Sequence, residues 1–173
     1  MKKEFTISIF TEDKTGLLAR VISIFTKRHI NIESLTASQS SLQDIYRVMI
    51  VVTIEEAMVI KLVAQIEKQI DILKAFYYNN SEIVYQEIAL YKVPSRAFMN
   101  GGTMESLIRK HNARIIEIET EYIVVEKTGL HEETEALLEE FRIHGVYEFV
   151  RSGRVAGVKP MEQLNKYLKS IKH

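Results

Sequence analysis

The sequence predicts an α+β protein built from two tandem units, each with the order β-α-β-β-α-β. Three observations lead to this prediction. Some segments alternate apolar and polar residues with period two, as half-buried strands do, and others carry apolar residues at helical spacing. The same order of segments also occurs twice, at a spacing of about 80 residues. Each half is therefore expected to be a split βαβ, or ferredoxin-like, unit with two helices on one face of an antiparallel sheet.

In the first half, the stretch "EFTISIF" places Phe5, Ile7 and Ile9 on one face of a strand. Helical spacing follows directly after Gly16, and a β-branched, aromatic run begins at Ile45. The elements expected in this half are strands at 4–10, 29–38, 45–53 and 71–79 and helices at 16–28 and 55–70.

The second half repeats this order with little residue identity to the first. Its expected elements are strands at 87–93, 113–119, 122–128 and 146–153 and helices at 102–111 and 131–143. Only Thr120 and Glu121 separate the middle strands, which predicts a hairpin. The predicted organisation is a sensing domain at 1–80, a linker at 81–86, a second ferredoxin-like domain at 87–158 and an amphipathic tail at 159–173.

Composition excludes several classes of function. Of the 173 residues, 46% are hydrophobic and 27% are charged, as in an ordinary globular protein. Lys plus Arg and Asp plus Glu number 23 each, so the chain has no basic footprint for nucleic acid. It contains no cysteine. No window is apolar enough to span a membrane, and the first residues lack the apolar run of a secretory signal, so we expect a cytoplasmic protein.

No motif for catalysis or metal binding is complete. The stretch "HEETE" at 131–135 has Glu135 where a zinc-binding helix needs its second histidine, which favours a solvated acidic face. The glycines of "NGG" at 100–102 indicate a turn, and "RSGR" at 151–154 indicates a strand end. His29 is expected to cap a helix C-terminus. RNA-binding modules share the fold but need more aromatic and basic residues than the strand at 45–53 offers.

The most informative stretch is "TEDKTGLLARV" at 11–21, where an acidic turn ends in Gly16 and leads into an apolar helix. Two explanations remain open. Gly16 can serve a tight turn, with Asp13 or Thr15 as the helix N-cap. Alternatively, the backbone N–H groups of the first helical turn can hold a carboxylate, with Asp13 accepting hydrogen bonds from an α-ammonium group.

A strand, a turn of the type D-x-x-G-L-L and an amphipathic helix resemble the ACT domain, an amino-acid-sensing module. A longer stretch, "GLLARVISIFTKRHINIESLTAS" at 16–38, resembles the small regulatory subunit of acetolactate synthase, with "NIESLT" at 31–36 as its most specific part. The likeness continues through "EIALYKV" at 87–93, "RIIEI" at 114–118 and "RSGRVAG" at 151–157.

The resemblance implies a non-catalytic chain without cofactors of its own. It implies a homodimer that binds a branched-chain amino acid, usually valine, at the interface between its ACT domains. It also implies a partner, the catalytic subunit, which carries thiamine diphosphate, magnesium and FAD and which this chain stimulates and makes sensitive to feedback inhibition. The expected effector-binding residues are Asp13, Lys14, Thr15, Gly16, Leu17, Leu18, Asn31 and Ile32.

Asp13 departs from the family, in which an asparagine occupies this turn position. An aspartate keeps the acceptor for an ammonium group but adds charge near the ligand carboxylate, which puts valine sensitivity in doubt. The C-terminal half departs as well, because Gly101 and Gly102 precede a short helix where the family has a longer polar one.

Two other functions stay open from the sequence. A stand-alone tandem ACT regulator would have the same domains without an acetolactate synthase partner. An enzyme on this scaffold, such as an acylphosphatase, needs an arginine in the loop after the first strand, and "TEDKTG" at 11–16 has none.

Overall fold

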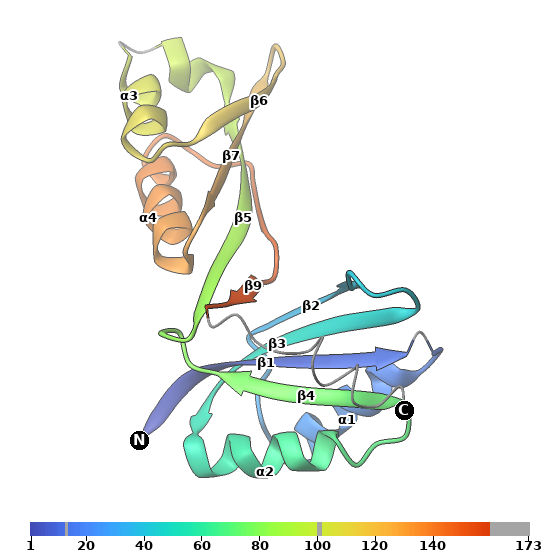
Figure 1. Ribbon diagram of the computed structural model, residues 1–173. Coiled ribbons are helices and arrows are strands. Elements are labelled where there is room, and N and C mark those ends of the chain that lie inside the picture. The colour runs from blue at the N-terminus through green and yellow to red at the C-terminus, as the bar shows by residue number, and fades with distance from the viewer. Residues whose placement is uncertain (13, 100–101, 160–173) are drawn as a thin grey trace. The chain divides into compact units, whose positions relative to one another are not determined.

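The chain forms two compact units in a computed structural model that describes residues 1–12, 14–99 and 102–159 (Figure 1). Among the described residues, the first unit comprises residues 1–85 together with 154–159, and the second comprises residues 86–153. Each unit contains an antiparallel sheet and two α-helices. The predicted tandem α+β fold is confirmed.

The first unit has the predicted order of elements and a four-stranded antiparallel sheet with strand order β2-β3-β1-β4. Both helices lie on the same side of this sheet (Figure 1). Its elements are β1 (Lys2–Glu12), α1 (Leu17–Lys27), β2 (Ser34–Gln39), β3 (Ile45–Glu55), α2 (Glu56–Ile66) and β4 (Ile72–Tyr78).

The core of this unit follows from the period-two pattern of β1. Phe5, Ile7 and Ile9 face the helices, and each lies opposite an apolar residue of β3 in the register. A slip of one residue would turn all three toward the other face, so this apolar pattern specifies the register. The helices cover these strands with Leu17, Val21, Ile24 and Phe25 from α1 and Val59, Leu62, Val63 and Ile66 from α2.

Helix α1 ends in a backbone motif that shortens the strand predicted at 29–38. The N–H of His29 donates to the carbonyl of Thr26 at 3.0 Å, and the N–H of Ile30 donates to that of Phe25 at 3.0 Å. With His29 left-handed at φ 54°, this is a Schellman motif. Residues 29–33 are used to reverse the chain, so β2 begins at Ser34. The expectation that His29 terminates the helix is correct, although it does so through its backbone.

The second unit repeats this plan on a second antiparallel sheet, with order β6-β7-β5-β8, and β9 also pairs with β5. A 3₁₀ helix that the sequence did not predict follows Pro94. The elements are β5 (Ile83–Pro94), whose first residues lie in the first unit, η1 (Ser95–Met99), α3 (Thr103–Lys110), β6 (Arg114–Ile118), β7 (Tyr122–Gly129), α4 (His131–Arg142) and β8 (Glu148–Arg151). Strand β9 (Val155–Val158) belongs to the first unit.

Helices α1 and α3 share local geometry although their sequences differ. Each has a glycine N-cap in the left-handed region, Gly16 at φ 81° and Gly102 at φ 76°. Each also ends in the same type of turn, with Asn112 at φ 50° in the position of His29. The tandem organisation is therefore repeated in the backbone turns as well as in the order of elements.

The structural division differs from the predicted bounds at two places. The stretch predicted as a linker at 81–86 contains the start of β5 at Ile83. Residues 154–158, predicted within the second domain, belong to the first unit, where Ala156 packs with Met49 and Ile83. Most of the predicted tail, 160–173, lies outside the described residues.

Arg154 explains why the chain returns to the first unit. Its side chain is 2% exposed and forms an ion pair with Glu4 at 2.8 Å. It donates hydrogen bonds to Thr6 Oγ1 at 2.9 Å and Asn80 Oδ1 at 3.2 Å, and its guanidinium lies 3.8 Å from the ring centroid of Tyr85. A buried charge is tolerated only with such partners. Arg154 therefore links β1, the β4–β5 turn and the returning segment.

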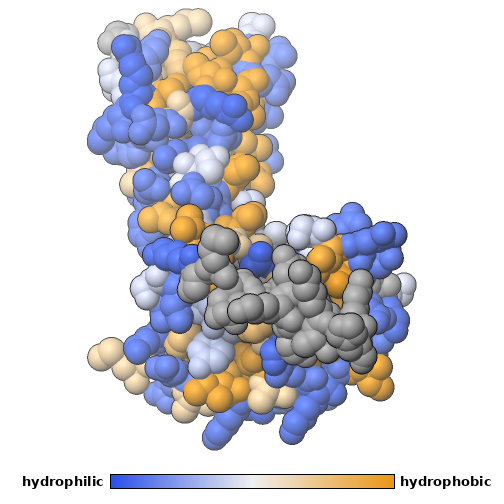
Figure 2. Space-filling model, viewed as in Figure 1, coloured by the Kyte–Doolittle hydropathy of each residue, from blue (hydrophilic) through white to orange (hydrophobic). Residues whose placement is uncertain are grey.

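An apolar edge remains exposed in the second unit. Strand β6 lies at the edge of its sheet, and its residues Ile115, Ile116 and Ile118 are all exposed, Ile118 at 69%. Figure 2 shows hydrophobic side chains on this part of the surface. Edge strands of this kind are usual places for protein association. None of the described helices has the length and apolar character needed to cross a membrane.

We predict that Arg154→Met lowers the free energy of unfolding by about 2 kcal/mol, because it leaves the polar partners of the guanidinium without their charged donor. The neighbouring substitution Val155→Ala, at a side chain that is 60% exposed, is the matched control and should change stability by less than about 0.5 kcal/mol. Urea denaturation followed by circular dichroism measures both. Equal effects would mean that the buried guanidinium does not anchor this segment.

Candidate functional site

The turn between β1 and α1 has the geometry that only glycine adopts easily. Gly16 has φ 81° and ψ −4°, and the N–H of Leu17 donates to the carbonyl of Lys14 at 3.3 Å. These values describe a type II β-turn with glycine at its third position. A Cβ atom built on Gly16 would meet no described atom within 4 Å. The glycine is therefore required by the backbone conformation, and the space beside it is open.

This open space lies at a helix end that no side chain of the described residues caps. Gly16 itself is the N-cap of α1, and no described side chain hydrogen-bonds to the cap, so Thr15 does not serve as the N-cap. Lys14, Thr15 and Gly16 are all exposed. Asp13, the other expected cap, lies outside the described residues. The first-turn N–H groups carry the positive end of the helix dipole, and an anion can approach them.

Asp71 holds the turn in place, a role that the sequence analysis missed. Its backbone carbonyl accepts hydrogen bonds from Thr11 Oγ1 at 2.9 Å and from the N–H of Glu12 at 3.3 Å. Its carboxylate accepts from Lys14 Nζ at 2.5 Å and from Arg20 Nη2 at 3.0 Å. The turn residue Lys14 and the helix residue Arg20 are thereby fixed by one aspartate from the loop before β4.

These contacts stabilise the charged form of Asp71. The hydrogen bond from Lys14, together with the neighbouring Arg20, lowers the pKa of the Asp71 carboxyl below its usual value. The same hydrogen bond raises the pKa of Lys14. Asp71 has φ 77°, a conformation that Asp and Asn tolerate better than most residues. In the sequence, this role is indicated only by an aspartate between a predicted helix and a predicted strand. The side chains that Asp71 binds are 51 or more positions away, so no local pattern connects them.

Asn31 does not join this turn within one chain. Gly16 precedes α1, whereas Ile30 is tied to Phe25 near the other end of the helix. At a rise of 1.5 Å per residue, Gly16 and Phe25 are about 13 Å apart along the axis. Asn31 is exposed and follows Ile30 directly. The two parts of the expected site therefore lie at opposite ends of α1.

Comparisons with known proteins identify the family. Residues 7–74 match the family model described as "AHAS small subunit-like ACT domain". Residues 86–158 match the model described as "Small subunit of acetolactate synthase". The acetolactate synthase small subunit of Bacillus subtilis is 35% identical over 168 residues, covering 94% of each chain. That of Mycolicibacterium smegmatis is 34% identical over 151 residues, covering 87% of this chain and 88% of its own. The chain belongs to the acetolactate synthase small subunit family.

A solved structure agrees with the fold of this family member. The small subunit of acetolactate synthase from Thermotoga maritima superposes with a TM-score of 0.83, covering 91% of this chain and 98% of its own, at 24% identity. Because the superposition covers both halves, the two-unit organisation is that of the family. The family match agrees with the resemblance carried by residues 16–38.

The three apolar residues expected at the site differ in accessibility. Leu17 is 4% exposed and belongs to the core, so its side chain contacts other core residues. Ile32 is partly buried against the same core. Leu18 is 38% exposed at the open end of α1, beside Gly16. Of the three, Leu18 offers the most accessible apolar surface next to the turn.

The side chains of the other candidate motifs contact carboxylates of this chain. His131 Nδ1 lies 3.3 Å from Glu87 Oε2, and Arg151 Nη1 lies 3.0 Å from Glu135 Oε2. Both arginines of "RSGR" thus pair with carboxylates of this chain, Arg154 with Glu4. Within residues 1–12, 14–99 and 102–159 no cluster of three His, Asp or Glu side chains can hold a metal ion.

We predict that Gly16→Ala destabilises the chain by about 1–2 kcal/mol, because alanine is strained in the left-handed region. The expected cause is the backbone alone, since the added methyl group meets no described atom. Gly16→Asn should therefore cost clearly less, because asparagine tolerates this conformation. Urea denaturation compares the variants. Equal losses for alanine and asparagine would contradict a conformational origin.

A second prediction concerns pH. The pKa of Asp71 is lower in the folded chain than the value of about 3.9 in the unfolded chain, so its charge stabilises the fold above that pH. This stabilisation is lost as the pH falls through the folded pKa. We expect the stability difference between wild type and Asp71→Asn to be largest near pH 6 and to shrink toward pH 3.

Urea denaturation at several pH values measures this difference. The exposed Glu33, whose side chain has no hydrogen bond or ion pair with the described residues, supplies a matched control through Glu33→Gln. The difference in free energy of unfolding between wild type and Glu33→Gln should vary much less with pH than that for Asp71→Asn. A difference for Asp71→Asn that stays constant from pH 6 to pH 3 would show that the ion pairs with Lys14 and Arg20 do not stabilise the fold.

Proposed function

We propose that this chain is the regulatory, non-catalytic subunit of a cytoplasmic acetolactate synthase and that it binds a branched-chain amino acid at the turn before α1. The observation that carries the site is the N-terminus of α1 behind Gly16, which no described side chain caps and which has open space in front of it. Membership of the family supplies the enzyme to which the chain is assigned.

The turn offers the groups that an amino acid needs. The ligand carboxylate is placed on the first-turn N–H groups of α1, where the helix dipole favours a negative charge. Lys14 and Arg20 lie nearby, where Asp71 pairs with both and Glu12 pairs with Lys14, so the helix end itself supplies the attraction for the carboxylate. The exposed Leu18 presents an apolar surface to an isopropyl or isobutyl group. Asp13 is assigned to the ammonium group, as the sequence analysis expected.

Two copies of the chain are needed to complete the site. Gly16 and Asn31 lie at opposite ends of α1, so one chain cannot bring them to the same ligand. In a two-fold dimer with antiparallel α1 helices, Gly16 of one copy lies near Asn31 of the other. Leu18 and Ile22 are spaced by four residues on the outer side of α1, and neither is buried. They supply apolar surface for this contact.

The catalytic subunit is the proposed partner. It would carry thiamine diphosphate, magnesium and FAD and perform the chemistry, while this chain stimulates it and transmits inhibition. We expect that adding this chain to the purified catalytic subunit raises its acetolactate synthase activity, and that valine, leucine or isoleucine lowers it again. If the two chains neither co-purify nor affect activity, the chain is a stand-alone tandem ACT regulator.

We predict that Gly16→Asp abolishes amino-acid binding, since its carboxylate occupies the anion position with like charge. Gly16→Asn is the matched control because it tolerates the same backbone conformation without the charge, and it should bind more tightly than Gly16→Asp. Isothermal titration calorimetry with valine, leucine and isoleucine measures the affinities. Wild-type affinity in Gly16→Asp would show that the helix end is not the carboxylate site.

Mixing two defective chains tests whether the site is shared. Asn31→Ala should weaken binding without unfolding the chain. When Gly16→Asp and Asn31→Ala chains are unfolded and refolded together, half of the dimers are mixed, and each mixed dimer contains one intact site. About a quarter of the wild-type sites should then return. Recovery of no sites would contradict a site shared between two copies, and recovery of about half of them would place Asn31 outside the site.

A further inference from the structure

Lys127 is a buried cation that the fold of the second unit does not use. It lies in β7 opposite Ala89 of β5, on the face of the sheet that the helices cover. The next residues on this face, Val125 and Ile123, are part of the hydrophobic core. Lys127 is only 7% exposed, although lysine is rarely buried without a partner.

Its ammonium group has no bonded partner in the described part of the chain. The structure gives Nζ neither a hydrogen bond nor an ion pair there. The charge of Lys127 contributes to the lowered pKa of the neighbouring Glu126, but Thr128 and Arg114 hydrogen-bond that carboxylate. A lysine side chain that is largely buried without a partner is rare, so its presence calls for an explanation.

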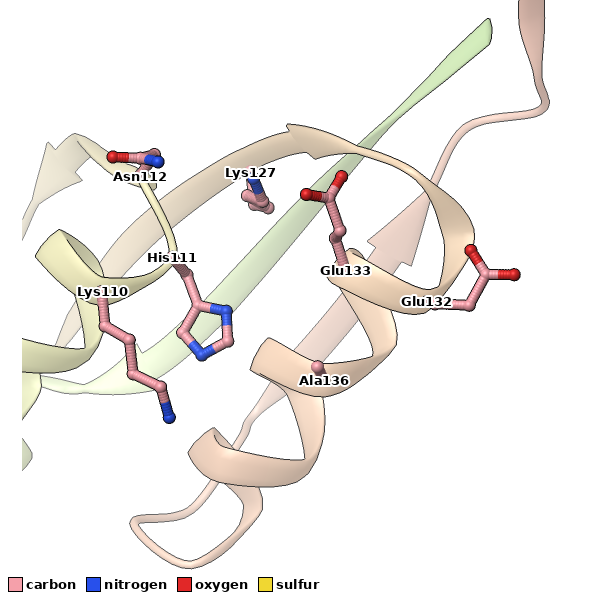
Figure 3. A pocket seen from close by; sticks show the side chains of 7 residues that line it. All are labelled: Lys110, His111, Asn112, Lys127, Glu132, Glu133 and Ala136. Atoms are coloured by element: carbon pink, nitrogen blue, oxygen red, sulfur yellow. The ribbon is translucent and has the colours of Figure 1, made fainter.

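Lys127 lines a pocket of about 320 Å³ between the end of α3 and the first turn of α4. Figure 3 shows it between Asn112, which follows α3, and Glu133 of α4. Within the same unit, Gly129 lets these groups approach. A Cβ atom there would lie 2.6 Å from Glu133 Oε2 and 3.2 Å from Lys127 Cε. The volume is in the range of small-molecule sites.

The other charged groups of this pocket are largely engaged. Lys110 Nζ and His111 Nε2 both contact Glu140 Oε1, at 2.7 and 2.9 Å. Glu133 Oε2 accepts a hydrogen bond from the N–H of Leu130 at 2.7 Å. Glu132 lines the same pocket, and its carboxylate has no hydrogen bond or ion pair with the described residues. The site therefore combines an unpaired ammonium group, on a largely buried side chain, with carboxylates at its α4 side.

We propose that this pocket binds a free amino acid as a second effector site, with the ligand carboxylate on Lys127 Nζ. The ligand ammonium group is placed near Glu132 and the second oxygen of Glu133. A dianion such as phosphate fits less well, because Glu132 and Glu133 line the α4 side of the pocket with negative charge. This pocket is formed by residues other than those of the site at Gly16.

The test uses the full chain carrying Gly16→Asp, which silences the proposed first site. Alanine, valine, leucine, isoleucine and glutamate are titrated by calorimetry, with acetate and inorganic phosphate as simple anions. At least one amino acid should bind at one per chain and at least about tenfold more tightly than either anion. Absence of binding by all five amino acids would overturn the proposal and leave the Gly16 site untouched.

Lys127→Met removes the charge and keeps the length of the side chain. It should weaken amino-acid binding at least about tenfold. Lys92→Met is the matched control, since Lys92 lies in β5 of the same unit but does not line this pocket, and it should change the affinity by less than about threefold. Unchanged affinity in Lys127→Met would overturn the assignment.

Stability of the unliganded chain supplies an independent measurement. If the ammonium group of Lys127 is unpaired, Lys127→Met should raise the thermal unfolding midpoint of the Gly16→Asp chain. A saturating amino acid should then raise the midpoint of the Gly16→Asp chain more than that of the same chain carrying Lys127→Met. A lower midpoint for Lys127→Met without ligand would mean that Lys127 already has a stabilising partner, which would contradict the proposal.

Discussion

The packing of α1 against β1 and β3 is the constraint on which the functional site depends. Leu17, Val21, Ile24 and Phe25 are all buried on the sheet, so the helix cannot slide or rotate without exposing its apolar face. The helix therefore presents its N-terminus behind Gly16 at one end of the sheet and leads to Asn31 at the other. The proposed shared site between two copies is a consequence of this packing, because no movement short of unfolding brings the two ends together.

The two units show how far a repeated fold diverges while its turns are retained. Both first helices begin after a left-handed glycine and end in the same backbone motif, with His29 in one unit and Asn112 in the other. These turns are determined by backbone geometry, which different side chains can satisfy. The surfaces differ, since the first unit has an open helix end and the second has an apolar edge at β6 and a charged pocket at Lys127.

The largely buried charged side chains of this molecule differ in whether they have a partner of opposite charge within the chain. Arg154 and Asp71 have partners that account for their positions, one anchoring the returning segment and the other bracketing the turn before α1. Lys127 has no such partner in the described residues, which is why it indicates a ligand. Burial alone does not distinguish these cases. The difference lies in whether the fold itself supplies the opposite charge.

Local sequence patterns predicted the order of elements, the two units and the glycine turn at Gly16, because apolar periodicity and glycine in turns are local properties. The sequence also determined the family, since residues 16–38 carry the resemblance that the comparisons bear out. The apolar pattern predicted that β2 begins at residue 29, whereas it begins at Ser34, because the Schellman turn between them has no distinctive sequence. The contacts of the folded chain were needed to show that Asp71 holds the turn, that residues 154–158 return to the first unit and that Lys127 is buried without a partner among the described residues. These facts depend on contacts between residues far apart in the chain, such as Arg154 and Glu4 at a separation of 150 positions, which no local pattern records.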